Sequence, residues 1–211
     1  MTPVRRTAKR RSSSCTTGIL PTLGSGTRPL EFEGRLDLEF QRIMLVAPNV
    51  FRYTEQPETF RFSVGNRRCK YTPDGLAHTT VGLVYFEVKP TKILSRSPDL
   101  DGRLASIKRE CASRNSKFEI VTEADIRRGK LLTNSTALWS AVQTVEIDQI
   151  RNTCRNLRHK EFPASVAQIA PALGTNPWPL VKALLGLRFL ATDLALPFSP
   201  STVVSRGLRD W

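Results

Sequence analysis

Apolar residues recur at helical spacing in the segment 35–47, three or four positions apart, which predicts a helix with one buried stripe. The stripe consists of Leu36, Phe40, Ile43 and Ala47. Pro48 ends this helix. Glu39 precedes Phe40 at the edge of the stripe, where a carboxylate is partly shielded and can still reach a neighbouring cleft.

A β region follows this helix. Apolar and polar residues alternate over 60–64, which predicts a strand, and Gly65-Asn66 supplies the turn after it. The chain then reaches Pro73-Asp74, and a second turn is expected from Gly75 to Thr80. The apolar run 81–88 predicts the next strand, which Pro90 ends because proline has no N–H for the sheet ladder.

Helix and strand patterns alternate further along the chain. Residues 103–114 show a helical apolar face, and 118–121 form a short apolar run typical of a strand. Thr122 and Asp125 have the spacing of a capping box for another helix. This order predicts a mixed α/β fold, in which a mixed sheet is flanked by helices.

The C-terminal part has a different pattern. A helix is expected over 136–160, Ser165 can cap a second helix, and a turn at 174–177 leads to a third. The segment 189–204 can supply a wing, so the whole is typical of a small helical, winged-helix-like domain that binds DNA. The alternative is an ordinary helical core that binds protein. The basic residues near the first helix end can meet phosphate or solvate that end; they are Arg151, Arg155, Arg158 and Lys160.

Residues 1–30 are predicted to form a disordered basic arm, because no acid precedes Glu31 and few apolar residues are present. The arm either lies along a DNA backbone or only confers solubility. The predicted organisation is therefore an arm at 1–30, an α/β domain at 31–135 and a helical domain at 136–211.

The charge balance favours a polyanionic partner. Lys and Arg number 32 against 19 Asp and Glu, a net charge of +13, and neutralising phosphates releases counterions. The four cysteines form no C-x-x-C motif and only two histidines exist, which argues against a zinc cluster and favours free thiols. Neither a membrane-length apolar run nor a signal-peptide core is found, so a cytoplasmic protein is expected.

Asp74, Glu87 and Lys89 carry the candidate chemistry. Side chains at i and i+2 of a strand share a face, so Glu87 and Lys89 would point the same way from an otherwise apolar strand. Such charges are costly to bury unless they are paired or bind a metal. Asp and Glu supply the hard oxygen ligands that Mg²⁺ needs for phosphodiester hydrolysis, and a lysine can orient water or stabilise negative charge.

An isolated E-x-K on a strand is more often a surface salt bridge than a nuclease site. Three further features favour the nuclease: Asp74 after a proline, Glu39 on the upstream helix, and a basic chain with a DNA-binding-like C-terminal part. We therefore predict Glu39, Asp74 and Glu87 as metal ligands, with Lys89 as the fourth catalytic residue.

The order of these motifs resembles the TnsA family, the endonuclease subunit of heteromeric transposases. The resemblance covers residues 31–140 and rests on four motifs and the stretch 118–126 that follows them. The motifs are Asp37-Leu38-Glu39, Glu55-Gln56-Pro57, Tyr71-Thr72-Pro73-Asp74 and Glu87-Val88-Lys89-Pro90.

The resemblance implies a restriction-endonuclease-like fold with Mg²⁺ or Mn²⁺, and a family triad at Glu39, Asp74 and Glu87 with the lysine at Lys89. It also implies nicking at the 5′ ends of a transposon while a DDE-type transposase cuts and joins the 3′ ends. The implied partners are double-stranded transposon-end DNA, that transposase subunit and an AAA+ regulator, in a bacterial, nucleoid-associated protein.

Two positions qualify the resemblance. Gly75 stands where relatives carry a bulky apolar residue such as Phe, which affects packing beside the site. Gln56 matches a recurrent family position, and a structural hydrogen bond is expected there rather than catalysis. The alternatives are a stand-alone nuclease of the same fold, as in phage or defence systems, and a DNA-binding adaptor without activity.

Overall fold

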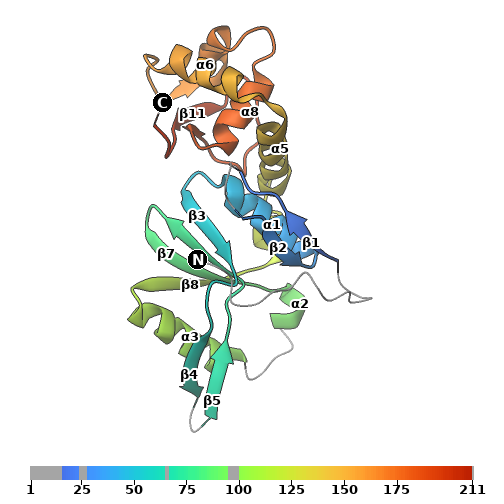
Figure 1. Ribbon diagram of the computed structural model, residues 1–211, viewed down its shortest axis with the longest axis vertical. Helices are drawn as coiled ribbons and strands as arrows, with labels where there is room; N and C mark the ends of the chain where they lie inside the picture. The colour runs from blue at the N-terminus through green and yellow to red at the C-terminus, as the bar shows by residue number, and fades with distance from the viewer. Residues whose placement is uncertain (1–15, 24–27, 65–66, 95–99, 211) are drawn as a thin grey trace. The chain divides into compact units, whose positions relative to one another are not determined.

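The computed structural model describes residues 16–23, 28–64, 67–94 and 100–210 (Figure 1). These residues belong to two compact units. The first unit takes in Arg28–Gln41 and Val50–Ile126 together with the chain up to Thr22. The second takes in Arg42–Asn49 and the chain from Arg127 onward. The units thus separate after Ile126, whereas the sequence places the boundary after residue 135.

A four-stranded mixed sheet forms the centre of the first unit, in the order β3-β6-β7-β8. Its strands are β3 (Val50–Glu55), β6 (Gly75–Thr79), β7 (Gly82–Val88) and β8 (Ser116–Val121). Strand β6 runs antiparallel to both β3 and β7, and β8 runs parallel to β7. The helices of this part of the chain are α1 (Arg35–Val46), α2 (Thr91–Leu94), α3 (Leu100–Ser113) and α4 (Glu123–Ile126).

Aromatic side chains cover both faces of this sheet. On one face, Tyr85 of β7 packs against Phe60, in a cluster that also holds Ile107 and Cys111 of α3. On the other face, Phe86 packs against Phe40 of α1, with ring centroids 5.1 Å apart. A mixed sheet flanked by helices is therefore confirmed.

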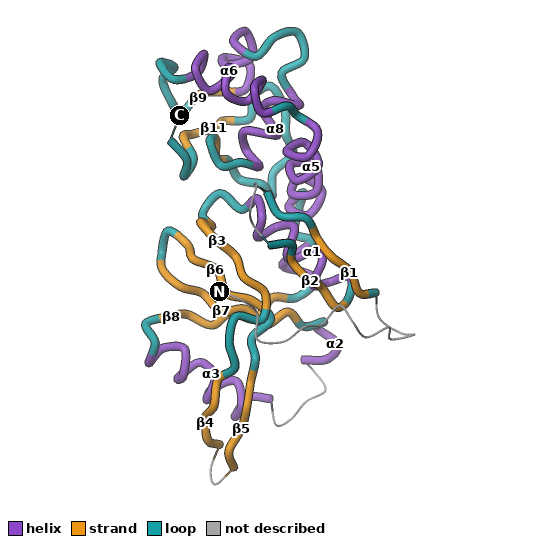
Figure 2. The backbone as a smooth tube through the Cα atoms, viewed as in Figure 1, coloured by secondary structure: helices purple, strands orange, loops and turns teal. Residues whose placement is uncertain are grey.

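Two hairpins complete the unit (Figure 2): β1 (Thr17–Leu20) with β2 (Leu30–Glu33), and β4 (Phe60–Val64) with β5 (Arg67–Tyr71). The prediction of a disordered arm is wrong for Thr17–Leu20, because this segment pairs with β2 and buries Leu20. The basic residues between Arg5 and Arg11 lie outside the described residues, as does the predicted Gly65-Asn66 turn.

The predicted turn from Gly75 to Thr80 is also wrong, because Gly75–Thr79 is strand β6. This segment contains turn-forming residues, but it pairs along its length with both β3 and β7. Tertiary pairing of this kind overrides local propensity. The edge strand β3 was not predicted.

The second unit consists of short helices and a three-stranded sheet ordered β10-β11-β9. Its helices are α5 (Leu131–Thr144), α6 (Ile147–Leu157), α7 (Val166–Ile169), η1 (Ala170–Ala172) and α8 (Trp178–Gly186). Its strands are β9 (Ala164–Ser165), β10 (Leu190–Ala191) and β11 (Val203–Arg206). The single helix predicted over 136–160 is two helices, because Val145 and Glu146 both have extended backbone angles.

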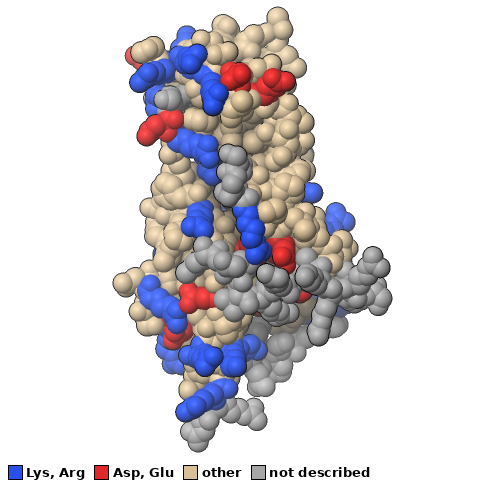
Figure 3. All heavy atoms as spheres, in the orientation of Figure 1, with Lys and Arg blue, Asp and Glu red and all other residues tan. Residues whose placement is uncertain are grey.

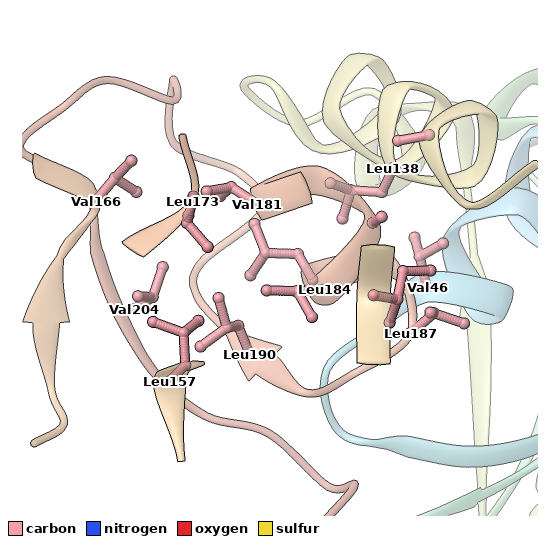
Figure 4. Packing of buried hydrophobic residues seen from close by; sticks show 14 of the residues in the cluster. Val46, Leu138, Leu157, Val166, Leu173, Val181, Leu184, Leu187, Leu190 and Val204 are labelled. Atoms are coloured by element: carbon pink, nitrogen blue, oxygen red, sulfur yellow. The ribbon is translucent and has the colours of Figure 1, made fainter. Parts of the chain in front are cut away.

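Buried aliphatic side chains from most of these elements form the core of the second unit (Figure 4). Leu138 of α5, Leu157 of α6 and Leu184 of α8 are fully buried in it. The predicted cap is confirmed: Ser165 Oγ accepts from the Gln168 N–H, and the Gln168 side chain accepts from the Ser165 N–H at 2.7 Å. In the described part of the chain, no helix combines the length and the apolar character needed to cross a membrane.

We expect Leu184→Ala to lower the stability of the second unit by about 2–5 kcal/mol, because it leaves a cavity in a close-packed core. Leu184 is 0 % exposed, and Leu196, a control in the same unit, is 59 % exposed. Leu196→Ala should change stability by less than about 0.5 kcal/mol. Amide hydrogen exchange in α5 and α8 measures both effects, and equal protection in the two variants would contradict this core.

Candidate active site

Asp74 lies directly before β6, next to the C-terminal end of β7. Its backbone N–H donates to the Phe86 carbonyl at 3.0 Å, which extends the ladder by one residue beyond Gly75. Its Oδ2 accepts the Val88 N–H at 2.8 Å. The carboxylate of Asp74 is therefore fixed beside the C-terminal end of β7.

Glu87 and Lys89 lie on the same side of this strand end, as their spacing predicts. Lys89 Nζ is 2.8 Å from Glu87 Oε1, and the Tyr71 hydroxyl donates to Glu87 Oε2 at 2.5 Å. The Glu87 side chain is only 11 % exposed. Each carboxylate oxygen of Glu87 thus has a hydrogen-bonding partner, which offsets the cost of burying its charge.

Asp74, Glu87 and Lys89 line one hollow of about 560 Å³. Two further cations, Lys70 and Arg103, line it as well. The remaining walls come from Thr59, Tyr71, Thr72, Leu94, Leu104, Ile107 and Ile120. Three basic side chains around two acids make a surface that suits an anionic group such as a phosphate.

The neighbouring charges keep the lysine protonated. Burial alone would lower the pKa of Lys89, but the carboxylates of Glu87 and Asp74 outweigh it, and the pKa is raised above its usual value. Burial and the Glu87 charge raise the pKa of Tyr71, so its hydroxyl remains a donor. Lys89 is therefore suited to stabilising negative charge rather than to removing a proton.

The upstream helix presents two acids, Asp37 and Glu39, and the charge of Asp37 is coupled to that of Asp74. Burial raises the pKa of Asp37 to about 7, and the charge of Asp74 contributes to the rise. The Glu39 side chain is instead turned toward Arg35, with Oε1 2.7 Å from the guanidinium Nε. Asp37 is therefore a second candidate on this helix, beside Glu39, whose role as a metal ligand stays a prediction.

Helix geometry explains the difference. Residues three or four apart share a helix face, so Asp37 lies one turn from Phe40 and Gln41, whereas Glu39 is rotated by about 200° from Asp37. Phe40 packs on Phe86, the residue that accepts the Asp74 N–H bond. Neither Asp37 nor Glu39 lines the hollow itself.

The chain from β3 through β8 matches a known family model. Residues 47–123 match the model described as TnsA-like endonuclease N terminal. This segment is therefore similar to the N-terminal domain of TnsA-like endonucleases. The match confirms the resemblance to the TnsA endonuclease family, and the mixed sheet flanked by helices is consistent with a restriction-endonuclease-like fold. No curated protein matches the chain.

The TnsA-like match contains Asp74, Glu87 and Lys89, but it begins only after the C-terminal end of α1. Asp37 and Glu39 therefore lie outside the matched residues. Gln56 lies inside them at a backbone φ of +41°, and its N–H donates to the Asp74 carbonyl at 3.0 Å. This contact is made by the backbone, and among the described residues no hydrogen-bond partner is found for the buried Gln56 Oε1, so a structural bond of this side chain stays a prediction.

Tyr53 explains why glycine follows Asp74 in this TnsA-like domain. A Cβ added to Gly75 would lie 2.6 Å from Tyr53 Cζ, closer than atoms approach in real structures. The Tyr53 ring is buried and also contacts Phe40 edge-on. The Tyr53 ring thus fills the space that a bulky residue after Asp74 would otherwise occupy.

The acids of the site offer oxygen donors, the ligands that a divalent cation such as Mg²⁺ prefers. Among the described residues, no three His, Cys, Asp or Glu side chains are gathered closely enough to form a metal-binding group. However, Mg²⁺ keeps several waters and commonly takes only one or two carboxylates plus substrate phosphates. Burial is the main cause of the raised pKa of Asp37 and the charge of Asp74 adds to it, so a cation beside the two carboxyls would favour their ionised forms. The residues present therefore fit Mg²⁺ or Mn²⁺.

We expect Asp37→Asn to stabilise the metal-free domain at alkaline pH. The folded pKa of about 7 exceeds the usual 3.8, so the folded state binds more protons between these values and loses stability as pH rises. Asparagine avoids that loss, and a gain of about 1–2 kcal/mol is expected at pH 8, vanishing near pH 4. Amide exchange in β6 and β7 with a chelator present measures it.

The matched control is Glu39→Gln, which alters a neighbouring acid on the same helix. It removes one partner of the Arg35 contact and should give no gain in stability at pH 8. An Asp37→Asn gain that is the same at pH 4 and pH 8 would contradict the electrostatic origin.

Proposed function

We propose that this protein is a metal-dependent DNA endonuclease that hydrolyses phosphodiester bonds. In this proposal it nicks the 5′ ends of a transposon in concert with a DDE-type transposase. The single observation that carries the proposal is the shared hollow of Asp74, Glu87 and Lys89 within a TnsA-like endonuclease domain.

Each site residue has a distinct task in the proposed reaction. Asp74 and Asp37 would hold Mg²⁺ or Mn²⁺, with Glu87 as a third acid. When bound, the cation neutralises charge on the phosphate oxygens and lowers the pKa of water. The bond from the Val88 N–H orients the Asp74 carboxylate. Protonated Lys89 stabilises negative charge on the phosphate, and Tyr71 orients Glu87.

The second unit supports a DNA-directed role. The proposal of a winged helix is supported by its element order, α6-β9-α7-α8-β10-β11, with β11 paired to both β9 and β10. Helix α6 buries Ile150, Cys154 and Leu157, while Arg151, Arg155 and Arg158 stay exposed. We assign to this unit contact with DNA or with the transposase, and to an AAA+ regulator the control of the complex.

A nicking assay on supercoiled plasmid with Mn²⁺ or Mg²⁺ tests the enzyme. We expect Asp74→Asn, Asp37→Asn and Lys89→Ala each to lower the nicking rate by about 100-fold or more, as loss of a group that acts on the transition state does. Glu39→Gln is the matched control on α1 and should stay within about threefold of wild type.

Four results would count against the proposal. Equal nicking by wild type and Asp74→Asn would show that Asp74 does not take part in catalysis. Loss of activity in Glu39→Gln but not in Asp37→Asn would show that Glu39, rather than Asp37, is the metal ligand on α1. Site-specific cutting by the isolated chain would favour a stand-alone nuclease, because the proposed enzyme takes its target from its partner. DNA binding without cutting, with or without the transposase, would favour an adaptor.

A further inference from the structure

The hairpin of β4 and β5 carries positive charge on one of its two faces. The strand register places Arg61 opposite Lys70 and Ser63 opposite Arg68. Because side chains alternate along a strand, these four side chains project from the same face. All four are exposed.

The opposite face of the hairpin anchors it to the sheet. Phe60 and Tyr71 are buried in the cluster with Tyr85 and Ile107, and Phe62 packs against its edge. The rings of Phe60 and Tyr85 meet edge-on with centroids 4.9 Å apart. The core thereby fixes the orientation of the cationic face.

Folding alone does not account for these charges. Arg114 of the same unit pairs with Glu58 and Glu110, but no ion pair is found for Arg61, Arg68 or Lys70 within the ranges that the structure describes. Like charges directly opposite each other on neighbouring strands destabilise a sheet. Figure 3 shows Lys and Arg side chains gathered where Figure 1 places β4 and β5.

The cationic face leads directly into the candidate active site. A second hollow, of about 460 Å³, is lined by Arg61, Phe62, Ser63, Arg68, Cys69 and Lys70. Lys70 also lines the hollow that contains Asp74, Glu87 and Lys89. The next residue, Tyr71, donates to Glu87. A strand that ends in the site is thus basic over the residues that lead to it.

We propose that this cationic hairpin face, formed by Arg61, Ser63, Arg68 and Lys70, binds the phosphate backbone of double-stranded DNA next to the bond that is cut. The inference rests on the proposed endonuclease function and names the surface that presents the substrate to it. A two-stranded ribbon is narrow enough to follow a DNA groove, and Arg and Lys contacts to phosphate fix position without reading sequence. Binding through this face is therefore independent of base sequence.

Fluorescence anisotropy of the full chain with a labelled duplex of arbitrary sequence tests the proposal, with a chelator present so that no cutting occurs. The triple variant Arg61→Ala, Arg68→Ala and Lys70→Ala should raise Kd at least about 10-fold in moderate salt. It should also reduce the slope of log K against log salt by about 2–3, since each phosphate contact contributes about 0.9.

The matched control removes three equally exposed cations of the same unit: Lys108→Ala, Arg109→Ala and Lys117→Ala. This control should change Kd by less than about threefold, because these residues lie on α3 and β8 rather than on the hairpin. A variant with Arg61→Lys and Arg68→Lys keeps the charge and should bind within about threefold of wild type.

The outcomes separate this surface from the catalytic proposal. Asp74→Asn should bind DNA as wild type does and fail to nick it. Equal loss of affinity in the hairpin and control triples, or wild-type affinity in the hairpin triple, would overturn the inference. A protein that never cuts but loses DNA affinity only in the hairpin triple would retain the binding surface and reject the endonuclease.

Discussion

The pairing of β6 with β7 is the constraint on which the candidate site depends. Asp74 precedes β6 and Glu87 is the last residue but one of β7, so the register that places Gly75 opposite Phe86 brings both acids to one end of the sheet. The Asp74 carboxylate accepts a hydrogen bond from the Val88 N–H, so the orientation of this carboxylate depends on the same strand pairing. A slip of one residue would move Glu87 and Lys89 to the other face.

The site concentrates charge that the fold by itself does not need. Glu87 is compensated by Lys89 and Tyr71, but Asp37 is left with a raised pKa because burial and Asp74 both oppose its ionisation. Residues that oppose stability in this way are typical of functional sites. On the opposite face of the hairpin from Phe60, the exposed cations pose the same conflict between folding and binding.

Most helices and strands of the first unit, and some of those of the second, could be predicted from the sequence. Alternation along β7 predicted that Glu87 and Lys89 share a side, because period two is a local property of the chain. It could not select between Asp37 and Glu39, since that choice depends on which helix face packs on Phe86. Strand β6 could not be predicted because it contains turn-forming residues. The helix break at Val145 and Glu146 could not be predicted because neither residue is Gly or Pro.

Tyr53 and Gly75 have a consequence for how such domains diverge. The ring and the missing side chain occupy one volume, so a larger residue at 75 requires a smaller one at 53. A larger residue at position 75 alone would clash with the Tyr53 ring, and a smaller residue at position 53 alone would leave a void next to Asp74. The two positions are therefore expected to change together among descendants of this chain, and an intermediate carrying only one exchange would have a misplaced carboxylate.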